Sequence, residues 1–150
     1  MLGIASVAAL AGWYRDNARD LPWRRPDFDA WGTLVSEIML QQTQVSRVAV
    51  EIDRWLERWP TPADLADAPT HEVLRQWGTL GYPRRALRLQ DAARAIVERH
   101  GGTVPRDVAA LLALPGIGDY TARAVAVFHF GDRHPVVDTN VRRVIARAVH

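Results

Sequence analysis

The segment that most constrains the fold of this chain is a short glycine-rich hairpin, Leu114-Pro115-Gly116-Ile117-Gly118. Pro115 presets one backbone angle, and Gly116 and Gly118 can adopt the positive φ angles that side chains disfavour. A helix is predicted to follow at once, with Asp119 as its N-cap. Unpaired backbone N–H groups then point outward at the positive end of a helix dipole. Such a hairpin can hold a phosphate group and reads no base edge.

The residues on both sides of the hairpin favour a DNA-binding unit. Val108, Leu111 and Leu112 continue a helix before it and helix-compatible residues follow it, so the pattern is helix-hairpin-helix. A turn that merely connects two helices is the alternative. Further along, Asp138 precedes a helix rich in arginine, with Arg142, Arg143 and Arg147. The simplest role of Asp138 is that of an N-cap, so this region indicates DNA binding and leaves catalysis open.

The composition excludes several kinds of chemistry. All 19 basic residues are arginine, so no lysine amine is available for a Schiff base. A GC-rich genome explains this bias better than nucleic-acid binding does, although arginine also suits phosphate contacts. The absence of Cys excludes disulfides, a thiol nucleophile and a cysteine-bound metal within these residues. The sequence contains no membrane-spanning stretch and no signal peptide, so we expect an intracellular, cytoplasmic protein.

Apolar residues recur at helical spacing along almost the whole chain, and no segment alternates securely as a strand would. The spacing predicts a first helix with Ile4 and Val7 on one face, ending before residue 19. Later helices are predicted over about 30–44, 48–59, 62–67, 70–77 and 83–99, then from 105 into the hairpin, directly after it, and over 140–150. Thr61 and Thr70 are the predicted N-caps of the two short helices. The fold class is therefore all-α, one domain over 1–150 built as a multi-helix bundle.

A polar stripe follows one face of the predicted helix over 30–44, with Thr33, Glu37, Gln41 and Gln44. The stripe contains no basic residue, and Met39 and Leu40 flank it, which indicates the wall of a cleft more than an open face. A carboxyl group there is partly desolvated, so its pKa rises toward the range of a general acid. A solvated surface glutamate is the ordinary alternative for Glu37.

Two other segments present aromatic side chains outside the predicted helices. Residues 23–29 combine Trp23 and Phe28 with arginine, which suits a pocket for an unstacked base. An ordinary surface loop with Trp23 tucked inward is equally consistent. Tyr82 lies between a glycine and a proline. It is either a plug of the core, the simpler interpretation, or a wedge pushed into a base stack.

Glu37 and Asp138 together have one specific chemical use, cleavage of a glycosidic bond. One carboxylic acid protonates the leaving group, while the other, ionised, stabilises the positive charge that builds on the sugar. Any domain of this size holds many pairs of acidic residues, so the spacing alone does not establish this use.

Five sequence blocks carry a resemblance to a known family, and they span 19–24, 36–45, 80–82, 114–122 and 137–144. In this order, and over nearly the whole chain, they resemble the adenine DNA glycosylases of the MutY type, which belong to the helix-hairpin-helix glycosylase superfamily. The resemblance implies a monofunctional enzyme of base excision repair. Such an enzyme removes adenine mispaired with 8-oxoguanine or guanine in duplex DNA, and we expect it to be a monomer.

The resemblance also assigns roles to single residues. Glu37 matches the general acid that protonates adenine at N7, and Asp138 matches the carboxylate that stabilises the oxocarbenium-like sugar or briefly bonds to it. Tyr120 and Asn140 match residues that support this pair. The lining of the pocket for the flipped adenine matches Arg19, Trp23 and Arg24. The DNA-contacting positions match Gln42, Thr43 and Tyr82, and the phosphate clamp matches Leu114, Pro115, Gly116, Ile117 and Gly118.

Related activities remain as alternatives. Endonuclease III-like glycosylase/lyases carry a catalytic Lys where this chain has Tyr120, and the chain has no Lys. Thymine-removing mismatch glycosylases share a Tyr there and are the second candidate, although the run from Gln41 to Gln44 favours adenine. A non-catalytic DNA-binding module that retains the hairpin is a third candidate.

The family pattern continues beyond this sequence. Its further helices carry four Cys that bind a [4Fe–4S] cluster, and a separate domain inspects the oxidised guanine. Neither occurs within residues 1–150, so we expect the cluster ligands beyond residue 150 and no metal site within this chain. The sequence is therefore interpreted as a truncated catalytic domain whose partner is double-stranded DNA.

Overall fold

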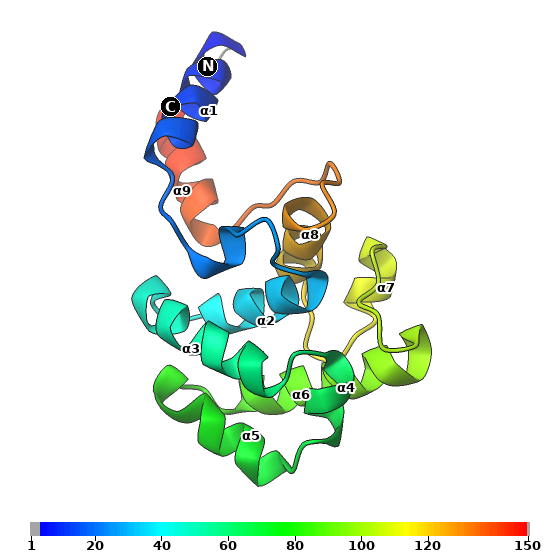
Figure 1. Ribbon diagram of the computed structural model, residues 1–150. Coiled ribbons are helices and arrows are strands. Elements are labelled where there is room, and N and C mark those ends of the chain that lie inside the picture. The colour runs from blue at the N-terminus through cyan, green and yellow to red at the C-terminus, as the bar shows by residue number, and fades with distance from the viewer. Residues whose placement is uncertain (1–3, 150) are drawn as a thin grey trace.

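The computed structural model describes residues 4–149, which fold into helices joined by short loops (Figure 1). The helices are α1 (Ile4–Asn17), α2 (Ala30–Leu40), α3 (Val45–Arg58), α4 (Pro62–Asp67), α5 (Thr70–Trp77), α6 (Arg84–His100), α7 (Val108–Leu112), α8 (Asp119–Phe128) and α9 (Thr139–Ala148). Two single turns of 3-10 helix are η1 (Pro22–Arg24) and η2 (Gly78–Leu80). No strand occurs in this range, so the all-α prediction is confirmed. The side chain of Ile4 and the predicted helix end at His150 lie outside the described residues.

Helix α2 is the centre of the fold. It packs against α3, α6 and α8, and its side chains Leu34 and Val35 are completely buried. Beside them, the ring of Trp55 makes edge-to-face contacts with Trp59 and Trp77, at centroid distances of 4.6 and 5.6 Å. This close packing fixes α2 in place, so a side chain carried by α2 is held in one position.

Helix α2 ends at Leu40, short of the predicted end at residue 44. Gln42, which was expected to be helical, has a positive φ of 59°. The carbonyl oxygens of Ile38 and Met39 accept hydrogen bonds from the side chain of Arg85, on α6. These are carbonyl groups that the end of a helix leaves without partners. A side chain distant in sequence therefore satisfies the end of α2, which local periodicity does not reveal.

The N-termini of the helices agree with the prediction in part. Thr61 caps α4 in a reciprocal capping box, as predicted. Thr70 is not a cap but the first residue of α5, because Pro69 takes the N-cap position. Gly118 is the N-cap residue of α8, since its extended backbone (φ −92°, ψ 175°) matches that position, and Asp119 falls in the first turn. Helix α7 also starts later than the predicted residue 105.

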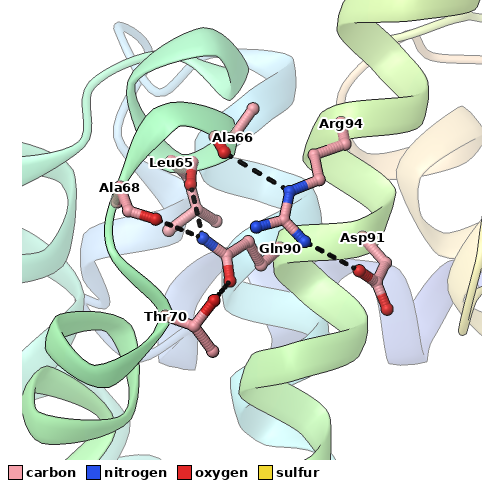
Figure 2. A network of polar contacts seen from close by, with 7 residues as sticks. All are labelled: Leu65, Ala66, Ala68, Thr70, Gln90, Asp91 and Arg94. Carbon is pink, nitrogen blue, oxygen red and sulfur yellow. Dashed lines mark hydrogen bonds and ion pairs between the residues drawn. The ribbon is translucent and has the colours of Figure 1, made fainter.

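A buried glutamine joins the corner between α4 and α5 to α6 (Figure 2). Gln90 Nε2 donates hydrogen bonds to the carbonyl oxygens of Leu65 at 3.1 Å and Ala68 at 2.7 Å. Thr70 Oγ1 donates to Gln90 Oε1 at 3.0 Å. Both ends of the buried amide are satisfied within the protein, so we assign this contact a structural role.

Helices α1 and α9 lie apart from α3–α6 in Figure 1. No described residue of α9 is buried, and the large apolar side chains of α1, Val7, Leu10 and Trp13, are 60–66% exposed. None of the helices in the described range 4–149 is long and apolar enough to cross a membrane. The terminal helices therefore contribute little to the core that α2 to α8 form.

Candidate active site

Glu37 lies within α2, where the packing of the core leaves it only 7% exposed. Burial away from water raises the pKa of its carboxyl group from the ordinary 4.5 to about 7. No basic side chain within residues 4–149 forms an ion pair with it. The alternative of a solvated surface glutamate is therefore wrong, and a large part of this carboxyl group is protonated near neutral pH.

The polar neighbours of Glu37 on α2 have partners of their own. Thr33 Oγ1 donates a hydrogen bond to the carbonyl oxygen of Asp29 at 2.9 Å. Gln41 Nε2 donates to Thr121 Oγ1 at 2.9 Å, which ties the end of α2 to α8. These hydrogen bonds hold the wall around Glu37 in place, and neither of them involves the Glu37 carboxyl group.

A cavity of about 930 Å³ brings most of the predicted site residues together. Glu37 lines it from α2, Tyr120 lines it from α8, and Asp138 lines it from the start of α9. Other predicted residues on its walls are Arg19, Trp23, Arg24, Gln42, Thr43 and Asn140. Segments that are far apart in the sequence therefore meet around Glu37.

The carboxyl groups of Glu37 and Asp138 both affect the pKa of Tyr120. The pKa of its half-buried phenol is raised to about 12, first by the loss of water around it and then by the negative charges of Glu37 and Asp138. The phenol therefore keeps its proton and can donate a hydrogen bond into the cavity. This electrostatic coupling indicates that the three groups belong to one site.

Asp138 combines the two roles that its sequence position allows. Its Oδ1 accepts a hydrogen bond of 2.7 Å from the backbone N–H of Val141, so it is the N-cap of α9. It also lines the same cavity as Glu37. Upstream, the Arg106 guanidinium pairs with Asp132 and holds the pKa of that carboxyl group below its usual range. This ion pair links the loop before α7 to the segment that leads from α8 to Asp138.

A second cavity, of about 640 Å³, is also lined by Glu37. Trp23, Arg24 and Glu37 line both cavities. Trp23 is half-buried against the core, as the surface-loop interpretation expects, whereas the pocket for an unstacked base stays a prediction. Phe28, from the loop predicted to suit a pocket, and Thr33, from the stripe predicted to be a cleft wall, both line this second cavity. Lining residues that sequence reasoning did not assign to the site are Tyr14, Ser36, Phe128 and His129. Tyr14, Ser36 and Phe128 lie on helices, but nothing in their own spacing indicates that their side chains meet a cavity.

The hairpin lies outside both cavities. Leu114 and Ile117 are buried and anchor it, and Gly116 has the expected positive φ, of 73°. Gly118 does not, because it is the extended N-cap residue of α8. No side chain caps the amide groups at this end of α8, which leaves them available to a phosphate. A Cβ atom at position 116 would approach the Cβ of Arg88, a residue of the first cavity wall, to 2.7 Å.

Tyr82 is not a plug of the core, because its side chain is 62% exposed. It has a positive φ of 48°, and it lies outside the two cavities. Gln42 is exposed too, whereas the Thr43 side chain is buried and its hydroxyl donates to the carbonyl oxygen of Leu80 at 2.8 Å. Arg85, which holds the end of α2, was not predicted, since a buried arginine cannot be distinguished from surface arginines by its spacing.

The residues described do not form a metal site. Within residues 4–149, no three side chains of His, Cys, Asp or Glu are grouped as ligands. The whole sequence lacks Cys, which a [4Fe–4S] cluster needs. The cluster implied by the family resemblance therefore does not fit the residues of this chain, and no chemical step is assigned to it.

Comparisons with known proteins find relatives over nearly the whole chain. An adenine DNA glycosylase of Mycolicibacterium smegmatis is 59% identical over 145 residues, which cover 97% of this chain and 50% of that protein. An adenine DNA glycosylase of Homo sapiens is 47% identical over 156 residues, which cover 96% of this chain and 29% of that protein. The chain therefore spans about half the length of the bacterial relative and less of the human one.

The fold is shared with a structure described as a thermostable thymine-DNA glycosylase. It superimposes with a TM-score of 0.88 at 32% identity, and the match covers 94% of this chain and 65% of that chain. A family model described as "HhH-GPD superfamily base excision DNA repair protein" matches residues 35–149, a range that contains Glu37, the hairpin and Asp138. On this match and on its fold, the chain belongs to the HhH-GPD superfamily of base excision DNA repair proteins.

Proposed function

We propose that this chain is the catalytic portion of a monofunctional adenine DNA glycosylase. It would hydrolyse the N-glycosidic bond of adenine mispaired with 8-oxoguanine or guanine. The observation that carries the proposal is the buried, unpaired Glu37 in one cavity with Asp138 and Tyr120. The identity to adenine DNA glycosylases over nearly the whole chain supports adenine as the base.

Glu37 acts as the general acid in this proposal. With a pKa of about 7, a large fraction of the carboxyl group holds a proton at neutral pH. It donates this proton to N7 of the flipped adenine, so the base leaves with the electron pair of the bond to the sugar. The resulting carboxylate then accepts a proton from the water that attacks the sugar carbon.

Asp138 stabilises the sugar cation. Its Oδ1 is held by the N–H of Val141, which fixes the carboxyl group and leaves Oδ2 for the developing positive charge. Tyr120 and Asn140 orient this pair, with the phenol acting as a hydrogen-bond donor. No lysine exists to form an imine with the sugar, so the base is released without strand cleavage.

Recognition uses the remaining cavity walls and the hairpin. Arg19, Trp23 and Arg24 offer aromatic and guanidinium surfaces to the flipped base. The exposed Gln42 and Tyr82 enter the duplex, and the buried Thr43 follows Gln42 in the chain. The hairpin holds a phosphate through Leu114, Pro115, Gly116, Ile117 and Gly118.

The proposal extends to the setting of the enzyme. Double-stranded DNA with an A:8-oxoguanine or A:G pair is the substrate, and the protein works as a monomer. It is cytoplasmic and associated with the nucleoid of a bacterium. The complete protein carries a [4Fe–4S] cluster on ligands beyond residue 150.

The test is base release from duplexes that contain one A:8-oxoguanine, A:G or T:G pair. Strand scission is scored with and without hot alkali, for this chain and its Glu37→Gln variant. We expect alkali-dependent scission at adenine that the variant loses. Release of thymine alone would favour a thymine mismatch glycosylase. Duplex binding without release by the folded chain would reduce these residues to a non-catalytic DNA-binding module.

A further inference from the structure

Arg85, in the first turn of α6, is a buried arginine without a carboxylate partner. It is 8% exposed, and it forms no ion pair within residues 4–149. Its Nη1 instead donates to the end of α2, at the carbonyl oxygens of Ile38 (3.0 Å), Met39 (2.9 Å) and Gln41. Its Nη2 donates to the end of η2 and the residue after it, at the carbonyl oxygens of Leu80 and Gly81 (3.0 Å each), and to Thr43 Oγ1 at 2.7 Å.

Two of these carbonyl groups precede unusual backbone conformations. Gln42 and Tyr82, with φ angles of 59° and 48°, are the non-glycine residues with positive φ in the described range 4–149. Gln42 follows the carbonyl of Gln41, and Tyr82 follows the carbonyl of Gly81. A residue's φ angle depends on the orientation of the peptide group before it. One guanidinium therefore fixes the two peptide groups on which these positive φ angles depend.

Further contacts orient the aromatic side chain. The Arg85 Cζ atom lies 5.8 Å from the centroid of the Tyr82 ring and 5.1 Å from that of Trp77. Trp77 Nε1 also donates to the carbonyl oxygen of Gly81 at 2.8 Å. Tyr82 and Gln42 remain exposed, so their own side chains do not hold these loops in place.

We infer that Arg85 is a positioning residue that presents Gln42 and Tyr82 to the duplex as one unit. The inference rests on the proposed function, which assigns these two side chains to DNA contact. A planar guanidinium can donate to both loops at once, whereas a lysine ammonium is a single point charge that cannot span them. Arg85→Lys should therefore weaken duplex binding although it retains the positive charge.

The experiment is a mutant cycle on duplex affinity, measured by fluorescence anisotropy in the Glu37→Gln background so that the base stays in place. We expect Arg85→Lys to weaken binding to an A:8-oxoguanine duplex by roughly tenfold. Arg94→Lys, at an exposed position of the same helix, is the matched control and should change binding less than about twofold. In a Gln42→Ala, Tyr82→Ala background, Arg85→Lys should weaken duplex binding by less than about a further twofold.

A spectroscopic measurement separates positioning from general stabilisation. The chain has three tyrosines, so fluorotyrosine labelling yields three ¹⁹F resonances, and Tyr82→Phe assigns one of them. Arg85→Lys should shift the Tyr82 resonance and leave those of Tyr14 and Tyr120 in place. Arg85→Met, with melting curves recorded, is the second variant in case the lysine variant does not fold.

The outcomes distinguish the two proposals. If the chain that keeps Arg85 fails to bind the duplex, both the proposed function and this inference are overturned. If that chain binds, but the loss from Arg85→Lys persists without Gln42 and Tyr82, only the inference fails. The inference also fails if all three ¹⁹F resonances move together, or if neither Arg85 variant folds.

Discussion

At the scale of single residues, the decisive feature is an acidic side chain placed in a core. Glu37 is surrounded by apolar packing and has no cationic partner within residues 4–149. Such an arrangement costs stability whenever the group is ionised, and a protein gains from it only if the proton is used. The same desolvation that weakens the fold therefore suits this carboxyl group to the general-acid role that we propose for it.

We predict that Glu37 makes the stability of the chain depend on pH. Its folded pKa of about 7 lies above the ordinary 4.5, so its neutral form stabilises the fold at low pH. This contribution is lost as the pH rises from about 4.5 through about 7. Between about pH 5 and about pH 8, the wild type should lose about 2 to 3 kcal/mol more unfolding free energy than Glu37→Gln does. Urea titrations of both proteins measure the difference, and parallel pH profiles would contradict the prediction.

At the scale of elements, the hairpin and the start of α9 each do more than connect helices. In the hairpin, a positive φ and the close approach of α6 meet at Gly116, whereas Gly118 has neither. At the start of α9, one carboxyl group caps the helix and faces the cavity. Paired substitutions can separate these roles. In the hairpin the second glycine is the control for the first, and at Asp138 two different substitutions are compared.

The first pair compares the two hairpin glycines. Gly116→Ala should cost at least about 2 kcal/mol of unfolding free energy, because the new Cβ meets Arg88 Cβ at 2.7 Å and the backbone has a φ of 73°. Gly118→Ala should cost less than about 1 kcal/mol, since nothing lies within 4 Å of its Cβ position. Thermal melts measure both costs. Equal losses in the two variants would mean that the contact with Arg88 does not constrain the hairpin.

The second pair separates capping from chemistry at Asp138. Asparagine caps helices about as well as aspartate, so Asp138→Asn should leave stability nearly unchanged, whereas Asp138→Ala should lose about 1 kcal/mol. Both variants lack the carboxylate, so both should lose base release while they still bind duplex DNA. Helix content and melting temperature are compared with single-turnover excision. Full excision by Asp138→Asn would reduce this residue to a helix cap.

At the scale of the whole molecule, Glu37 and Asp138 belong to helices that differ in how well they are packed. Glu37 is on the buried α2, whereas Asp138 opens α9, which has no buried residue among those described. Hydrogen exchange should therefore be fast in α1 and α9 and slow in α2 and α6. Binding of a duplex should slow exchange in α9, because Asp138 and Asn140 line the cavity. Exchange in α9 of the unbound chain as slow as in α6 would show that this assignment of stability is wrong.

Much of this molecule could be predicted from local patterns. Helical spacing predicted the all-α class, and the Pro-Gly-x-Gly run predicted the turn with a positive φ at Gly116. The stripe around Glu37 predicted a cleft wall because it lacked any basic residue. Each of these properties depends on residues close together in the chain, so the sequence displays it directly.

Other properties depend on contacts between distant segments, and only the tertiary structure decided them. Arg85 satisfies the end of α2 across the fold, so α2 stops at Leu40 while its helical pattern continues. Contacts between distant segments also decide three other properties. They are the exposure of Tyr82, the convergence of Glu37 with Asp138 and the aromatic lining of the second cavity. The sequence by itself thus determined the helical class, the hairpin and the acidic residues that we propose as catalytic. The three-dimensional packing determined which side chains lose water and which ones meet, because burial is a property of the assembled core.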